Sequence, residues 1–350
     1  MDLDLKRKIL RMLISGFYGK IINIMSDLNP YLKLDIGGII LYDHHAYNNK
    51  YKLNVSNPEQ IAALTHELQT RSTTPLMIAI ADEGGSRTPL KSDYGFKLDH
   101  KTPTAQAKKG PLHTYNSGKE MASNLLELGI NTNFGVVGNL KEGKFRPSNK
   151  SSSEDKFCYS IKPRETALLA ERFHSGASTV DGFAPVLKTF LKGNVPAQMQ
   201  IDTFKKIINN PLSDIGSVLV SCDINDEIDI VPVACSEFAI NKILREEIGF
   251  DGLIIAEDYE TSTAVNEEDF KRFPEPHEID QKKYKKYLIS AINAGVNMLI
   301  ISNNKLATLK HLENAVRIIY DAVELGDIDR SLIEESCEKI AKYKASRGLV

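Results

Sequence analysis

Long apolar runs, clustered cysteines and an excess of either charge are all missing from this sequence of 350 residues. No apolar run approaches the roughly 20 residues that a membrane helix needs, and the N-terminal segment has no small-residue cleavage site. The formal net charge is only -2 and there is no basic arm, so we expect neither nucleic acid nor a membrane as a partner. The four cysteines lack metal-type spacing and are too few for a disulfide scaffold, which predicts a cytoplasmic protein without a metal.

The composition is that of a folded globular protein, with 42% hydrophobic and 26% charged residues. Eight short runs are apolar on both faces, as in strands that are buried on both sides of a parallel sheet. These predicted strands are Arg11–Ser15, Gly37–Tyr42, Pro75–Ile80, Asn131–Val137, Ala184–Phe190, Ser217–Cys222, Gly252–Ala256 and Asn297–Ser302.

Segments with a helical period lie between the predicted strands. In one of them Met121 and Leu125 share a face, and Gly129 stands where a left-handed cap would end the helix. In another, Ser236 can cap the start and Gly249 the end. Eight such units predict an α/β fold, a single (β/α)8 TIM barrel over residues 1–350. The alternative is an open doubly wound sheet, but no GxGxxG or Walker-type loop follows the first strand, and no cofactor is expected.

In a barrel of this kind the chemistry belongs to the loops that follow the strands. Three of these loops are long and polar, at about residues 82–115, 139–162 and 258–283. Long loops within a compact domain are either functional lids or disordered insertions, and the sequence leaves both interpretations open.

Polar side chains stand just after, or late in, most of the predicted strands, and their balance is acidic. Clustered carboxylates fit a glycoside-hydrolysing pair or a divalent-metal site, but they also occur as solvated caps of the following helices. We expect these side chains to open onto one mouth of the barrel. They are Asp82, Glu83, Asn139, Lys188, Asp223, Glu257 and Asp258, with Arg87 as a further positive group.

Six segments, in order, resemble bacterial family 3 glycoside hydrolases, specifically the single-domain β-N-acetylhexosaminidases. They are GGIILYDHHAYN, PLMIAIADEGG, LLELGINTNFGVV, LREEIGFDGLIIAEDYE, AINAGVNMLIIS and GDIDRSLIEESCEKIAKYKASRGL. The resemblance covers nearly the whole chain and implies a barrel that acts on N-acetylglucosaminides.

The catalytic motifs of the family are altered in this sequence. The position of the family's nucleophilic Asp falls on Glu257, and the Asp that follows it in the motif falls on Asp258. The family's KHFPGHG loop, which supplies a histidine acid/base, reads LKTFLKGNVPAQMQID here, with Thr189 and Gly193 at the histidine positions. The resemblance therefore implies that the acid/base of the family is missing.

The sugar-binding motifs are altered as well. In the family's DxEGGR pattern, Ala81 stands at the Asp position, and the Arg is shifted to Arg87 or lost. Phe157 stands where the RSFGxDP motif has an Arg. We assign binding of a substrate to Asp82, Glu83, Arg87, Asn139 and Lys188.

Two hypotheses follow for function. In the first, the protein is a working glycosidase with Glu257 as nucleophile and Asp223 or Glu83 as a replacement acid. In the second, which we favour, it is catalytically silent toward N-acetylglucosaminides and binds a saccharide, a small polar ligand or a protein partner. A metal-dependent enzyme that uses the mouth carboxylates is a distant third.

Overall fold

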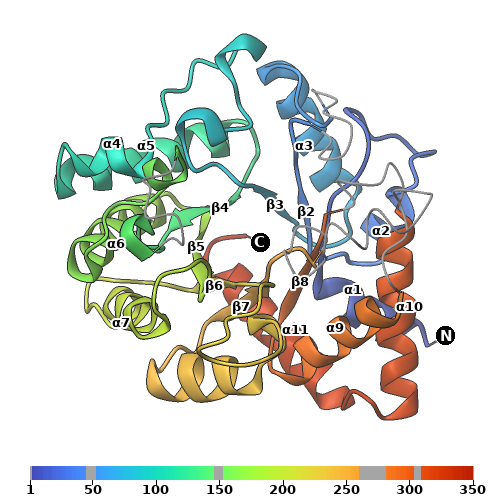
Figure 1. The fold of residues 1–350 in the computed structure, drawn as a ribbon. Coiled ribbons are helices and arrows are strands. Elements are labelled where there is room, and N and C mark those ends of the chain that lie inside the picture. Colours follow the sequence, from blue (N-terminus) through green and yellow to red (C-terminus); the bar gives the residue numbers. More distant parts are fainter. Residues whose placement is uncertain (1, 45–52, 146–152, 260–280, 303–308, 350) are drawn as a thin grey trace, which may run out of the picture.

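The chain forms a closed barrel of eight parallel strands (Figure 1), in a computed structural model that describes residues 2–44, 53–145, 153–259, 281–302 and 309–349. The eighth strand pairs with the first, which closes the barrel. The strands are β1 (Leu13–Ser15), β2 (Gly38–Ile40), β3 (Met77–Ile80), β4 (Thr132–Val137), β5 (Ala184–Phe190), β6 (Ser217–Val220), β7 (Leu253–Ala256) and β8 (Met298–Ile301). Each lies within one predicted run, so the prediction of a single-domain (β/α)8 barrel is confirmed.

Helices surround the barrel (Figure 1). The principal ones are α1 (Leu3–Arg11), α2 (Asn29–Lys33), α3 (Pro58–Arg71), α4 (Pro103–Ala107), α5 (Pro111–Glu127), α6 (Pro163–Ser178), α7 (Ala197–Ile208), the π-helix η6 (Phe238–Glu247), α9 (Gln281–Asn293), α10 (Lys310–Leu325) and α11 (Arg330–Ser346). Their ends follow the predicted signals: Gly129 has φ +73° after α5, and Ser236 accepts a 3.1 Å hydrogen bond from the backbone N–H of Ala239 in η6. None of the helices in the described ranges has the length and apolar character to span a bilayer.

Five short 3₁₀ turns lie in the described parts of the loops. They are η1 (Gly85–Arg87), η2 (Ser92–Tyr94), η3 (Gly143–Phe145), η4 (Ser153–Phe157) and η5 (Val233–Cys235). The first two belong to the predicted long loop at 82–115, which also contains α4. Most of the predicted loop at 258–283 lies outside the described residues.

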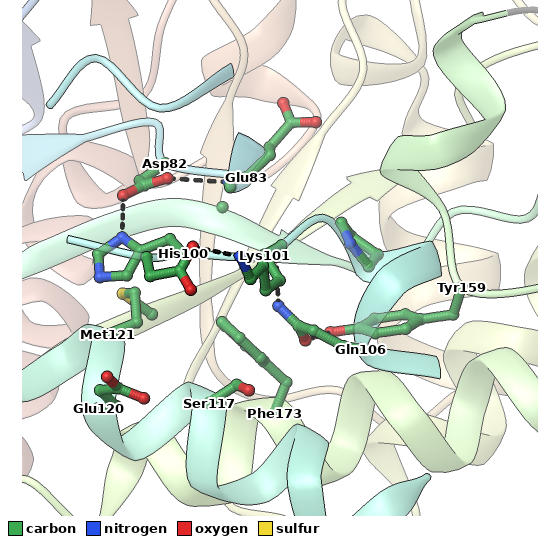
Figure 2. Close-up of a pocket in the computed structure, with 14 residues that line it drawn as sticks. Asp82, Glu83, His100, Lys101, Gln106, Ser117, Glu120, Met121, Tyr159 and Phe173 are labelled. Carbon is green, nitrogen blue, oxygen red and sulfur yellow. Dashed lines mark hydrogen bonds and ion pairs between the residues drawn. The ribbon is translucent and has the colours of Figure 1, made fainter. Parts of the chain in front are cut away.

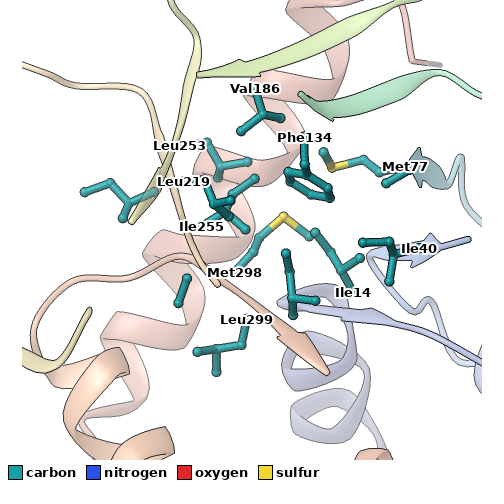
Figure 3. Close-up of a cluster of buried hydrophobic side chains, with 14 of the residues drawn as sticks. Ile14, Ile40, Met77, Phe134, Val186, Leu219, Leu253, Ile255, Met298 and Leu299 are labelled. Carbon is teal, nitrogen blue, oxygen red and sulfur yellow. The ribbon is translucent and has the colours of Figure 1, made fainter. Parts of the chain in front are cut away.

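Apolar side chains fill the interior of the barrel. Figure 3 shows Met298 between Phe134, Ile255 and Ile14, which come from strands on different sides of the barrel. All four are at most 2% exposed. Burial of such side chains contributes about 1.5 to 3 kcal/mol each relative to leaving them in water, and it leaves no channel along the axis. Binding and chemistry are therefore confined to the ends of the barrel.

Helices α5 and α6 approach each other closely through a pair of glycines. A Cβ added at Gly118 of α5 would lie 2.0 Å from the carbonyl oxygen of Phe173 in α6. A Cβ added at Gly176 of α6 would lie 1.9 Å from the carbonyl oxygen of Tyr115 in α5. Both neighbours are backbone atoms, so neither contact can be relieved by a side-chain rotation.

We expect Gly118→Ala to destabilise the protein by about 1 to 3 kcal/mol or more, because α5 and α6 must move apart to admit the methyl group. The free energy of unfolding in urea measures the effect. Ser123→Ala, a change of similar size on the same helix, should stay within about 0.5 kcal/mol of the wild type. Equal stability of the two variants would contradict the close approach.

Candidate functional site

A cleft of about 470 Å³ opens at the C-terminal ends of β3, β4, β5 and β7. Its lining includes five residues that the sequence analysis assigned to the site: Glu83, Arg87, Asn139, Lys188 and Glu257. The structure therefore brings together side chains that are up to 174 positions apart in the chain, from Glu83 to Glu257. This position at the carboxyl ends of the strands is where such barrels carry their sites.

Glu83 lies between two cations. Its carboxylate accepts hydrogen bonds from Lys188 Nζ at 2.6 Å and from Arg87 Nη1 at 2.5 Å. Burial raises the pKa of Glu83, but the charges of Lys188 and Arg87 outweigh it and hold the pKa below its ordinary value. The guanidinium carbon of Arg87 also lies 4.0 Å from the centre of the Phe157 ring, in a cation–π contact. Glu83 is thus a charged acceptor whose donors are already in place.

Glu257 is paired with a lysine that the sequence analysis did not assign. Lys192 Nζ lies 2.9 Å from Oε1 and 2.7 Å from Oε2 of Glu257, and the Thr189 hydroxyl donates to Oε1 at 3.3 Å. The same ammonium lies 3.9 Å from Oδ2 of Asp223, which stands beside the cleft. Burial lowers the pKa of Lys192, but the charge of Glu257 outweighs it, so the pKa lies above its ordinary value. Lys192 is therefore an ammonium at neutral pH.

A tight turn after β5 directs Lys192 into the cleft. Leu191 has φ +57° and Gly193 has φ +91°, both in the left-handed region. For a leucine this conformation costs about 1 to 2 kcal/mol, and Leu191 is 1% exposed, so packing holds it there. Asn139 fixes the start of the turn, since its amide donates to the Thr189 carbonyl at 2.8 Å and accepts from the Thr189 N–H at 2.7 Å. In this structure Asn139 positions the end of β5.

Three predicted site residues lie outside the cleft lining, namely Asp82, Asp223 and Asp258. The side chain of Asp82 is fully buried and faces His100, with His100 Nδ1 2.5 Å from Asp82 Oδ2. Figure 2 shows these two side chains facing each other while Glu83 extends away from them. Asp258 is 6% exposed and does not line the cleft. Asp82 does not reach the cleft in this structure, because its side chain is turned toward His100.

Sequence reasoning missed Lys192 and His100, and it overestimated the negative charge of the mouth. Lys192 could have been found, because it is a cation within the very loop where the family carries its acid/base histidine. His100 gave no such signal, since nothing in the spacing of 18 residues connects it with Asp82. In the part of the chain that the structure covers, no group of three or more His, Cys, Asp or Glu side chains could hold a metal ion.

Fold and cleft together define a (β/α)8 barrel with carboxylates gathered at its C-terminal mouth. Residues 5–343 match the model of the glycosyl hydrolase family 3 N terminal domain, so the chain belongs to this family. It is similar to a β-hexosaminidase of Nitrosospira multiformis, with 26% identity over 296 residues that cover 77% of this chain and 74% of that protein.

Solved structures of the family have the same fold. A glycoside hydrolase family 3 β-N-acetylglucosaminidase from a Paenibacillus species superimposes with a TM-score of 0.79 at 21% identity, covering 99% of this chain and 63% of that one. A β-N-acetylhexosaminidase from Beutenbergia cavernae superimposes with a TM-score of 0.72 at 16% identity, covering 98% and 99%. This chain therefore spans less than two thirds of the first protein and nearly all of the second.

We expect Glu83→Gln to destabilise the protein by about 1.5 to 3 kcal/mol at pH 7, because the hydrogen bonds from Lys188 and Arg87 lose their charged acceptor. A carboxyl group with a lowered pKa stabilises the fold above its unfolded pKa of about 4.3, and this contribution disappears as the pH falls through the folded value. The difference in the free energy of unfolding between wild type and variant should therefore become smaller below about pH 4.

Urea unfolding from pH 7 to pH 3 measures this gap. The control is Glu127→Gln, at the exposed end of α5, which should match the wild type throughout. A gap that stays constant across this pH range would show that the charge of Glu83 is not what stabilises the site.

Proposed function

We propose that the protein binds a saccharide in the cleft between Glu83, Lys188 and Glu257, and that it hydrolyses N-acetylglucosaminides very slowly or not at all. The observation that carries this proposal is the Lys192 ammonium, which contacts both carboxylate oxygens of Glu257. Saccharide binding is supported by membership of glycosyl hydrolase family 3 and by relatives named β-hexosaminidase and β-N-acetylglucosaminidase.

The pairing with Lys192 works against nucleophilic attack by Glu257. A retaining glycosidase needs a carboxylate that is free to bond to the sugar carbon. Here the oxygens of Glu257 accept from Lys192 and from the Thr189 hydroxyl, and the carboxylate gives up part of these charged hydrogen bonds as its negative charge passes into the bond to the sugar. Bonds of this kind contribute about 1.5 to 3 kcal/mol each, which slows the attack.

The residues near Glu257 are also poor acids for protonating the leaving oxygen. At the position of the family's first histidine, Thr189 offers a hydroxyl, which is not an acid near neutral pH. Lys192 has a pKa above its ordinary value, far from the neutral range in which a general acid works best. The general-acid contribution of about 10²- to 10⁴-fold is therefore largely lost.

The same groups suit the recognition of a sugar. Carboxylates accept hydrogen bonds from hydroxyls, and ammonium and guanidinium groups donate to them. Glu83, Lys188, Arg87 and Glu257 line one cleft and provide both kinds of partner. Glu83 and its two donors are held together before any ligand arrives, which reduces the entropic cost of binding.

The alternative function is a working glycosidase with Glu257 as nucleophile and Asp223 as acid. It is favoured by the position of Glu257 in the cleft lining and of Asp223 beside the same lysine. Robust hydrolysis of an unactivated saccharide would establish this alternative.

Binding and turnover are to be measured together on the wild type. We expect calorimetric titration with chitobiose to show binding, and Lys188→Met to weaken it about tenfold or more, because a charged donor that lines the cleft is lost. Chitobiose should not be hydrolysed measurably, whereas an aryl N-acetylglucosaminide with a good leaving group needs less acid assistance.

Any slow release of the aryl group should disappear in Glu257→Gln. Lack of binding by chitobiose and by other neutral disaccharides would reject the cleft as a saccharide site.

We expect Lys192→Met to raise the hydrolysis of an activated aryl N-acetylglucosaminide about tenfold or more, since the substitution releases the carboxylate of Glu257. Chitobiose should remain uncleaved, because no acid is gained. Lys205→Met, which removes a half-exposed lysine of α7, serves as the control for loss of a positive charge. A rate unchanged by Lys192→Met would mean that the ion pair is not what limits the reaction.

A further inference from the structure

A second, small cavity of about 20 Å³ lies behind the turn that carries Glu83, and His100 and Asp82 face each other at its edge (Figure 2). The Asp82 side chain is 0% exposed and the His100 side chain 6%. The His100 Nδ1 atom bonds to the carboxylate at 2.5 Å, and the Asn124 amide lies 3.4 Å from Nε2. An amide can either donate to a neutral ring or accept from a charged one, so Asn124 suits both protonation states of His100.

Asp82 and His100 together hold the turn that follows β3. Asp82 Oδ1 accepts from the Gly84 N–H at 2.9 Å, and Asp82 Oδ2 accepts from the Thr88 hydroxyl at 3.1 Å. The carbonyl oxygen of His100 accepts from the Gly85 N–H at 2.6 Å. These bonds span residues 82–88, the segment that contains Glu83 and Arg87.

The backbone of Asp82 is held in place by Asn133 of β4. Its backbone N–H donates to Asn133 Oδ1 at 2.9 Å, and its carbonyl accepts from Asn133 Nδ2 at 3.0 Å. Asp82 therefore cannot follow His100 if the ring moves away. A change in the bond between these two side chains is instead passed to the remaining partners of the carboxylate, Gly84 and Thr88.

Several charges set the protonation of His100. Burial lowers its pKa, but the hydrogen bond and charge of Asp82, together with Glu120 on α5 and the neighbouring Asp99, outweigh burial and raise it above its ordinary value. Glu83, Lys101 and the buried Tyr159 also line the cavity. A histidine with a raised pKa stabilises the folded state. This stabilisation is complete below the unfolded pKa of about 6.5 and is lost as the pH rises through the pKa of the folded state.

We propose that His100 is a positioning residue that fixes the Glu83–Arg87 turn through Asp82 in its protonated form and so makes saccharide binding in the cleft depend on pH. The inference rests on the proposed function, because it names a regulator of that same cleft. It assigns His100 no contact with the ligand, since the ring lines the small second cavity and is absent from the lining of the cleft.

The first experiment needs no ligand. Hydrogen–deuterium exchange of peptides that cover residues 82–88, expressed as protection factors between pH 6 and pH 9, reports how firmly the turn is held. We expect protection in the wild type to fall about 3- to 10-fold across this range, because the ion pair of His100 with the Asp82 carboxylate becomes a weaker bond from an uncharged ring to that carboxylate. The ring resonances of His100 should titrate over the same interval, and Asp82→Asn should move that titration to lower pH.

Two histidine variants separate positioning from a merely structural role. His100→Asn keeps an N–H donor near the place of Nδ1 but cannot titrate, so its protection should not change with pH beyond the drift of a reference peptide. His66→Asn replaces an exposed histidine of α3 and should behave like the wild type. Protection that does not change with pH in the wild type, or that falls equally in His100→Asn, would overturn the inference.

Calorimetric titration with chitobiose at pH 6 and pH 9 distinguishes this inference from the proposed function. We expect the affinity of the wild type to fall about 3- to 10-fold together with the protection, and that of His100→Asn to stay constant. Equal wild-type affinity at both values would reject His100 as a regulator while the cleft remains a saccharide site. Absence of binding at any pH, with a turn that still titrates, would reject the proposed function and leave the pH-dependent turn in place.

Discussion

The mouth of this barrel depends on the compensation of buried carboxylates by cations from other parts of the chain. An unpaired carboxylate in a dry environment is so unfavourable that it either finds a partner or gives up its charge. Glu83 is paired with Lys188 and Arg87, Glu257 with Lys192, and Asp82 with His100. The same arrangement recurs after β2, where Lys91 and His44 bond to the buried Asp43. The conformations of the loops are tied to these pairs, because Lys188, Lys192 and Lys91 each join the end of one strand to another segment.

The same compensation decides what the site can do. A glycosidase nucleophile needs a carboxylate whose lone pairs are available to the substrate, whereas a binding site needs charged groups held in place. Lys192 on both oxygens of Glu257 shifts the balance from the first requirement toward the second. The loop after β5 carries Thr189 and the cation Lys192, and Lys192 pairs with Glu257, so both residues fit the proposal of a binding site.

The fold and one half of the site could be predicted from the sequence. Runs such as PLMIAI and NMLIIS are apolar on both faces, and only a sheet covered on both sides accommodates them. Once the strands are placed, Glu83 and Glu257 must lie at the C-terminal end of the barrel, because they come shortly after β3 and β7. These are local consequences of the sequence. They require no knowledge of how the loops fold.

The partners of these carboxylates could not be predicted in the same way. Lys192 reaches Glu257 only because Leu191 adopts a left-handed conformation, which nothing in its residue type favours. His100 meets Asp82 after a loop of irregular structure, and the direction in which Asp82 points is decided by that meeting. Whether a side chain after a strand turns into the cleft or into the protein is a property of loop packing, which periodicity does not encode.

The filled interior of the barrel limits how a ligand can enter and leave the cleft. Because Phe134 and Met298 block the axis, a molecule bound at the C-terminal mouth has no exit through the opposite end. Ligands therefore enter and leave the cleft from the same end of the barrel, so a bound ligand obstructs the entry of the next.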